Sequence, residues 1–371
     1  MDNNNTADKR KLWTAEDHLN LLLSPDALAP SDTTSPDEQN IDLPTWFDEE
    51  KFARGQKYYY KNSYGMFVGK LCGLIAVLAV PTILRILMFT QRSSVPFTAY
   101  KRYIATLLHT TLWYDIKLTK DSRSWKSLIQ VRKRHFQAGQ SACAKGLGSV
   151  TQKDLALTQF GFMGFILIRP KFLGIQCDDK KDREAFVHVW RCVGYMMGLE
   201  DRFNICRDSL EETEDLCEVL LAKYFAPLLS TYNKDFEDMS KALLEGMWTF
   251  NPFIHFTTFM YFTRRLSGVS EYKFPLPNIV DNNDNNNLKE DNTKISKKLT
   301  TLDKIPESEI TSKVIVSESS SQFELMYEIK AGVFSDKSLN KGLRTIRDKN
   351  FEFETINGFC LIWTKNANSN G

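Results

Sequence analysis

Apolar side chains between Phe52 and Gly268 recur at the spacing of helices rather than strands, and this pattern limits the fold more than any other feature. In the segment DREAFVHVWRCVGYMMG, one helical face collects Phe186, Val189, Trp190, Val193 and Met197. The opposite face carries His188, Arg191 and Tyr195, which predicts that His188 faces solvent. Helix-start signals precede two other apolar runs, SLEE at 209–212 and TQKD at 151–154. We therefore expect an all-α fold with one large helical domain.

Composition divides the chain into four parts. Residues 1–43 are rich in Asn, Asp, Ser, Thr and Pro and predict a disordered leader. The helical domain is expected over residues 44–268, and an Asn/Asp-rich linker over residues 269–300. Residues 301–371 contain a few alternating runs that suggest strands, and we find no chemistry in this tail.

Charge and cysteine usage exclude several classes of protein. The 48 basic and 46 acidic residues leave a net charge of +2, too small to attract nucleic acid over a distance. The seven cysteines form no CxxC pair and no zinc-ligand pattern, so a disulfide scaffold is not expected. The first residues, MDNNNTADKRKLW, lack the apolar core of a signal peptide. This favours an intracellular protein, either cytoplasmic or associated with the endoplasmic reticulum membrane.

The most apolar stretch is Leu71 to Leu84, LCGLIAVLAVPTIL, which is interrupted by Pro81. It is shorter than the roughly 20 apolar residues that cross a hydrocarbon core. We expect a buried core helix kinked at the proline. A membrane-embedded or re-entrant segment is the alternative, so membrane association stays open.

The segment SWKSLIQVRKRHFQAGQ contains a basic cluster that a helical arrangement divides into two faces. Lys133 and Arg134 fall on the polar face, whereas Arg132 and His135 lie in a stripe with apolar residues. An inward guanidinium requires an anion, and a buried imidazole requires hydrogen-bond partners. One alternative is that Arg132 pairs with a carboxylate and His135 donates to a backbone carbonyl. The other is an iron porphyrin, whose propionates bind arginine and whose iron binds a neutral imidazole.

The preceding helix has a similar inward face. In AYKRYIATLLHTTLWYD, the residues that share it are Arg102, Ala105, Thr106, His109 and Trp113. Two helices with inward polar side chains suggest a pocket between them. Two histidines and two arginines suit a macrocycle better than a bare metal ion, because no carboxylates join them at ligand spacing.

These motifs resemble the catalytic domain of latex-clearing rubber oxygenases and of endoplasmic-reticulum-bound oxygenases of mpaB type. The similarity consists of RxxxT at Arg102 and Thr106, RxxH at Arg132 and His135, and the segments TQFGFMGFILIRP and FVHVWRCVGYMMGLEDRF. It covers roughly residues 43–268. The resemblance implies an all-helical fold around haem b, with His135 as the proximal iron ligand. It also implies that Arg102, Thr106 and Arg132 contact the haem or line its pocket.

The chain departs from the family pattern at two places. Ala105 stands where latex-clearing enzymes have a lysine as the distal ligand, and VPTILRILMFTQRSS has no glutamate to serve as their catalytic base. These departures argue against rubber cleavage itself. His109 lies one turn beyond Ala105 and is a candidate for the distal side of the iron. A hydrogen-bonded core histidine is the alternative for this residue.

The sequence thus predicts a haem b-dependent oxygenase or oxidoreductase that uses O₂ on an apolar substrate of isoprenoid or lipid type. No catalytic residue is assigned. The alternative is a helical haem-binding or membrane-associated interaction protein without turnover. Nucleic-acid binding through Lys133 and Arg134 is not expected, since no exposed aromatic residues are interleaved with them.

Overall fold

The computed structural model describes residues 13–269, and every regular element in this range is a helix. The only β-type pairing in this range is a single bridge between Pro30 and Thr151. The predicted all-α class is therefore confirmed. The linker and tail predicted for residues 269–300 and 301–371 lie outside the described residues, apart from Val269.

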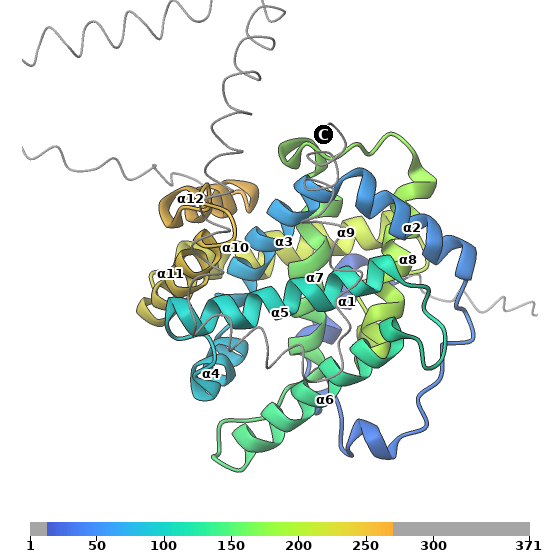
Figure 1. The fold of residues 1–371 in the computed structure, drawn as a ribbon, viewed down its shortest axis with the longest axis horizontal. Coiled ribbons are helices and arrows are strands. Elements are labelled where there is room, and N and C mark those ends of the chain that lie inside the picture. Colours follow the sequence, from blue (N-terminus) through green and yellow to red (C-terminus); the bar gives the residue numbers. More distant parts are fainter. Residues whose placement is uncertain (1–12, 270–371) are drawn as a thin grey trace, which may run out of the picture. The chain divides into compact units, whose positions relative to one another are not determined.

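Two helices, α3 (Ser63–Leu78) and α7 (Gln152–Ile168), pack against each other in the middle of the domain (Figure 1). The helix α7 is buried on nearly all sides, which fits its apolar sequence. A Cβ atom on Gly73 would lie 1.7 Å from the carbonyl oxygen of Gly161. The two backbones approach this closely because both positions lack a side chain.

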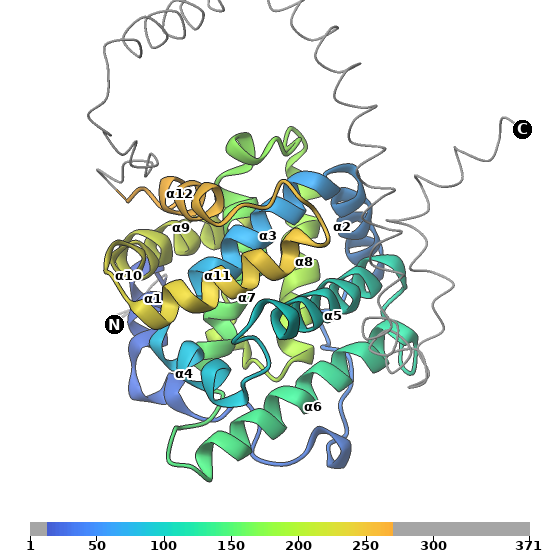
Figure 2. The same cartoon turned by 60° about the vertical axis from the view of Figure 1, so that its left-hand side comes forward.

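Further helices cover this pair. The helix α2 (Glu49–Lys61) packs on α8 (Lys180–Met196), and α5 (Pro96–Asp115) packs against both α11 (Lys234–Trp248) and α6 (Arg123–Cys143). Figure 2 shows α5 with α11 on one side and α6 on the other. The remaining helices are α1 (Ala15–Leu23), η1 (Pro25–Leu28), η2 (Pro36–Glu38), α4 (Pro81–Thr90), η3 (Pro170–Leu173), η4 (Asp201–Phe203), α9 (Leu210–Leu220), the π-helical turn η5 (Leu221–Phe225), α10 (Ala226–Ser230) and α12 (Phe256–Leu266).

Most of the apolar stretch from Leu71 to Leu84 is buried inside the protein, as predicted, but Pro81 is exposed and the stretch is not one kinked helix. The helix α3 ends at Leu78, and Pro81 opens α4, whose axis turns by 93° from that of α3. A proline suits the first turn of a helix, where its missing N–H is not needed. Within residues 13–269 no individual helix has the length and apolarity of a membrane span, and only this bent pair meets both criteria jointly.

The prediction of a disordered leader is wrong for residues 13–43, which pack on the domain. The helix α1 begins with a capping box between Thr14 and Asp17 and buries Leu19 and Leu22. It packs against α9, so the apolar patch in an otherwise polar segment gains a partner surface. Further along, Pro36 is also buried. Composition alone missed this, because a few buried leucines were enough to order the segment.

The expectation that His188 faces solvent is also wrong. The Nε2 atom of His188 accepts a hydrogen bond from the backbone N–H of Asp48 at 3.1 Å, and the residue is only 8% exposed. On the same face, Arg191 pairs with Asp201 and Asp208. The start of α2 and the segment before it cover this face of α8. The polar face of α8 therefore does not face solvent, although its amphipathic pattern predicts that it does.

Candidate functional site

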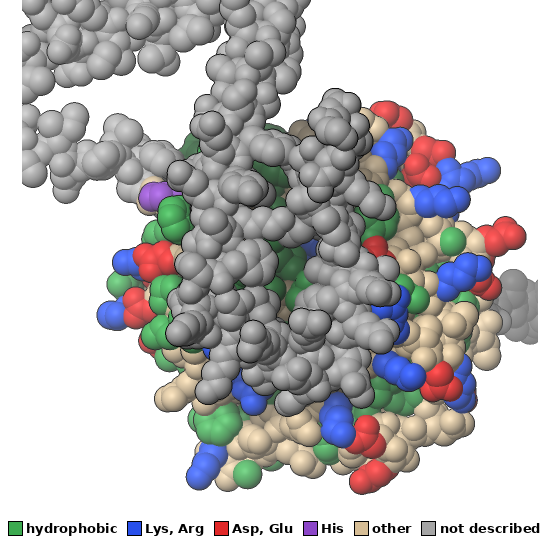
Figure 3. All heavy atoms as spheres, in the orientation of Figure 1, with side chains coloured by type: hydrophobic (Ala, Val, Ile, Leu, Met, Phe, Trp, Pro, Cys, Tyr) green, Lys and Arg blue, Asp and Glu red, His purple; other side chains and the backbone are tan. Residues whose placement is uncertain are grey.

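The helix α6 carries the predicted basic cluster, and its residues divide as expected. It begins at Ser122, whose hydroxyl accepts a hydrogen bond from the backbone N–H of Trp125. Arg132 is buried, Lys133 is half-buried and Arg134 is exposed. Lys133 pairs with Asp37, so the outer charge is locally neutralised. On the face shown in Figure 3, acidic and basic side chains lie side by side around the edge.

The buried Arg132 is fully occupied by protein groups. Its Nη2 and Nε atoms donate to the carboxylate of Asp32 at 2.5 and 2.9 Å, and Nη2 also donates to Gln39 Oε1 at 2.9 Å. A further bond runs from Nη1 to the carbonyl oxygen of Met196 at 3.3 Å. This is the carboxylate pairing that the sequence left as one alternative. The guanidinium of Arg132 is therefore not available to an external anion in this arrangement.

His135 presents the opposite situation. Its Nδ1 atom is buried and has no hydrogen-bond partner within residues 13–269. Burial is the largest cause that lowers the pKa of His135 to about 4, and the positive charge of Arg102 lowers it further. The imidazole is thus neutral at pH 7. The residue as a whole is only partly buried.

Arg102 and Thr106 lie on α5, one turn apart. The guanidinium of Arg102 has no hydrogen bond or ion pair to any residue in the range 13–269, and burial lowers its pKa. The Thr106 hydroxyl donates to the carbonyl oxygen of Arg102 at 3.1 Å. Its proton is therefore used within the helix, and Thr106 offers no free donor to a ligand.

His109 is a hydrogen-bonded core histidine. Its Nε2 atom lies 3.3 Å from Nη1 of Arg134, which can only donate, so Nε2 accepts. In the neutral ring Nδ1 then carries the proton and donates to Ser127 Oγ at 2.8 Å. Trp113 Nε1–H donates to the same oxygen at 3.0 Å. Burial lowers the pKa of His109 to about 4, and both ring nitrogens are engaged.

Arg102 and His135 are therefore the two predicted residues that the structure brings together with unused polar groups. A neutral imidazole and an unmatched guanidinium are the two kinds of group that a haem needs from a protein, an iron ligand and a cation for a carboxylate. Within the described part of the chain, no group of three or more His, Cys, Asp or Glu side chains is placed to hold a bare metal ion. The donor set thus fits a porphyrin better than a free cation.

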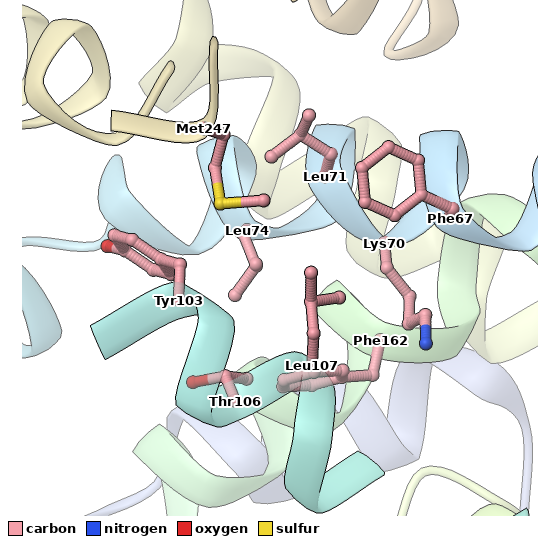
Figure 4. Close-up of a pocket in the computed structure, with 9 residues that line it drawn as sticks. All are labelled: Phe67, Lys70, Leu71, Leu74, Tyr103, Thr106, Leu107, Phe162 and Met247. Carbon is pink, nitrogen blue, oxygen red and sulfur yellow. The ribbon is translucent and has the colours of Figure 1, made fainter. Parts of the chain in front are cut away.

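The sequence reasoning missed one residue of chemical interest, Lys70. It lies on α3 and lines a small hollow of about 10 Å³ between α3, α5, α7 and α11. Thr106 lines the same hollow, and Figure 4 shows Lys70 at the end away from Tyr103 and Met247. A signal was present, because Lys70 is the only charged residue between Tyr64 and Leu84.

Comparisons with known proteins agree with the motifs. A "Rubber oxygenase" from Streptomyces sp. (strain K30) is 23% identical over 205 residues, which is 52% of this chain and 48% of that protein. The chain thus matches about half the length of this curated relative. No family model matches the sequence.

A solved structure described as "Structure of Latex Clearing Protein LCP in the closed state" aligns with a TM-score of 0.46 and 17% identity. It covers 70% of this chain and 75% of the other. None of the comparisons concerns the oxygenases of mpaB type. The resemblance to the latex-clearing rubber oxygenases, predicted from RxxxT and RxxH, is confirmed by the sequence match.

Proposed function

We propose that this chain is a haem b-dependent oxygenase that acts with O₂ on an apolar isoprenoid of polyisoprene type. The observation that carries the proposal is the neutral His135 imidazole, whose buried Nδ1 is unpartnered within residues 13–269, next to the unmatched Arg102 guanidinium. The sequence match to a rubber oxygenase supports the same reaction class. Because the match spans half of that protein, the activity and the substrate are part of the proposal.

In this proposal His135 holds the iron and Arg102 meets a carboxylate of the porphyrin. The bound haem supplies the oxygen chemistry, which no side chain can perform alone. The residues of the chain keep the site dry and apolar. Burial keeps the His135 imidazole neutral, so a nitrogen lone pair is available at pH 7. The Thr106 hydroxyl donates to the carbonyl oxygen of Arg102 in its own helix, so it adds no free polar donor to a lining that would contact a hydrocarbon.

Absorption spectroscopy of the full chain tests the haem site. Protein expressed with ample haem is expected to show a Soret band, and His135→Gly is expected to lose it. Added imidazole should restore the band in His135→Gly, because a small ligand can occupy the space left by the side chain. His255→Ala is the matched control, since His255 is exposed. A colourless wild-type protein, or a band that survives in His135→Gly without imidazole, would contradict the proposal.

A haem-binding protein without turnover is the second candidate, favoured by Ala105 at the position of the family lysine. Oxygen uptake separates the two. The proposed enzyme should consume O₂ when an apolar isoprenoid such as squalene is added, and His135→Gly should not. A coloured protein that consumes no O₂ with any isoprenoid would establish the binder instead.

A further inference from the structure

The helix α4, the start of α5 and the connection between them form a corner of the domain that has no acidic residue. Figure 1 shows this corner at the lower left. The whole segment from residue 51 to residue 114 contains no Asp or Glu, although 46 of the 371 residues of the chain are acidic. The helix α6, which packs against both α4 and α5, also lacks acidic residues. The absence of negative charge is therefore shared by three neighbouring helices.

The basic side chains of this corner are exposed and are not neutralised. Arg85, Arg92 and Lys101 form no ion pair among residues 13–269. Burial and the positive charge of Arg92 both lower the pKa values of Arg102 and Arg134, so the charge of Arg92 acts on α5 and on α6. The corner thus carries an uncompensated positive charge.

The acidic residues of α11, on the other side of α5, are in part already paired. Asp238 and Glu245 each lie within ion-pair distance of a lysine one turn earlier in the same helix. They therefore compensate charges of α11 rather than those of the corner.

Three apolar side chains are exposed among these cations. Met88, at the end of α4, is 36% exposed, and Val95 and Phe97, at the start of α5, are 52% and 44% exposed. Arg85 precedes Met88 by three residues and so lies on the same side of α4. Lys101 follows Phe97 by one turn, with Nζ 4.1 Å from the ring centroid. The apolar and basic side chains thus form one mixed surface.

We propose that this corner docks on the surface of a membrane that contains anionic lipids. The three apolar side chains would enter the boundary between headgroups and acyl chains, and the three exposed cations would contact the anionic headgroups. A soluble polyanion such as nucleic acid would use the cations but leave the apolar side chains in water, so the observations favour a bilayer. The proposal does not depend on the haem site. It would bring the protein to the phase in which an apolar isoprenoid dissolves.

Sedimentation of the full chain with lipid vesicles tests the basic part of this surface. We expect binding to vesicles of phosphatidylcholine and phosphatidylserine, little binding to phosphatidylcholine alone, and release at high salt. A basic residue near an anionic membrane strengthens binding about fivefold, so changing Arg85, Arg92 and Lys101 together to Gln should weaken it on the order of 100-fold.

A second set of three lysines provides the matched control. Lys57, Lys61 and Lys171 are also exposed and without an ion pair among residues 13–269, but they lie on α2 and η3. Changing these three to Gln should weaken binding less than about fivefold, because charges distant from the bilayer are screened. Equal losses in the two triple variants would overturn the proposal, and so would equal binding to vesicles with and without phosphatidylserine.

The apolar side chains distinguish a bilayer from a soluble polyanion. Replacing Met88, Val95 and Phe97 together by Ser should remove most of the binding to phosphatidylserine vesicles, whereas Phe172→Ser, on the 59% exposed Phe172, should leave it unchanged. Unchanged vesicle binding by the triple Ser variant would show that charge alone is recognised and would overturn docking on a bilayer. All the substituted side chains are exposed, and circular dichroism checks that each variant is folded. The assay needs neither haem nor O₂, so its outcome is separate from that of the haem experiment.

Discussion

The ion pair between Asp32 and Arg132 joins the segment before α2 to the helix that carries His135. Asp32→Asn removes the negative charge but keeps the size of the side chain. In the wild type, both carboxylate oxygens of Asp32 accept hydrogen bonds from Arg132, at 2.5 Å from Nη2 and 2.9 Å from Nε. The side chains of Arg132 and Asp32 are only 10% and 3% exposed, so water cannot replace the lost carboxylate.

The expected cost follows from what remains around Arg132. Leaving one member of a buried ion pair without its partner costs about 3–5 kcal/mol. The amide oxygen that replaces the carboxylate in Asp32→Asn would still accept one bond, and Gln39 Oε1 stays 2.9 Å from Nη2. These contacts place the expected loss near the lower end of the range, at about 3 kcal/mol. Urea unfolding of the full chain, followed by circular dichroism, measures it as a lower midpoint.

A second ion pair between the same two segments provides the control. Lys133 pairs with Asp37, and these side chains are 39% and 52% exposed. Asp37→Asn should therefore cost less than about 1 kcal/mol, because exposed pairs contribute little. If Asp32→Asn and Asp37→Asn lower the midpoint equally, burial of the Arg132 pair does not have the effect argued here. Combining Asp32→Leu with Arg132→Met should recover much of the loss, since no unpaired charge is left.

Two further predictions concern acid stability and helix packing. Burial lowers the pKa values of His109 and His135 from 6.5 to about 4, so the unfolded chain binds more protons between these values and stability should fall as the pH drops from 6.5 to 4. Each histidine adds up to about 1.4 kcal/mol per pH unit to that slope, and a slope that is unchanged in His109→Gln would contradict the assignment. Gly73→Ala should lower the unfolding free energy by about 3 kcal/mol or more, because the added Cβ would lie 1.7 Å from the carbonyl oxygen of Gly161. Gly69→Ala should cost less, since its nearest neighbour is a movable Ile166 side chain, and equal losses would refute the packing argument.

Local patterns were sufficient to predict the helices and the division of α6. Helical periodicity placed Arg132 inside and Lys133 and Arg134 on the outer face, because the direction of a helical side chain depends mainly on its position along the sequence. The same reasoning could not identify the partner of Arg132, which lies 100 residues earlier in the chain. Asp32 belongs to a segment whose polar composition resembles disorder, and only its packing on the folded domain reveals its role.

The two residues that sequence reasoning misplaced or missed have a common cause. His188 lies on the polar face of an amphipathic helix, but α2 and the segment before it form a second layer over that face. Lys70 immediately precedes the apolar stretch that begins at Leu71, and α3 extends through it and buries it. Helical periodicity indicates which side of a single helix packs against the core. It cannot show which polar faces are covered by another part of the chain.

The charges around His135 show how ligand binding at Arg102 and at the imidazole would be coupled. Arg132 is neutralised by Asp32, whereas Arg102 and Arg134 have no ion pair within residues 13–269, and of these two Arg102 has the larger effect on His135. The charge of Arg102 lowers the pKa of His135. A carboxylate bound at Arg102 would offset that charge and make the imidazole more basic, and a more basic imidazole binds iron more strongly. A porphyrin carries both groups on one molecule, so each of its two contacts would strengthen the other.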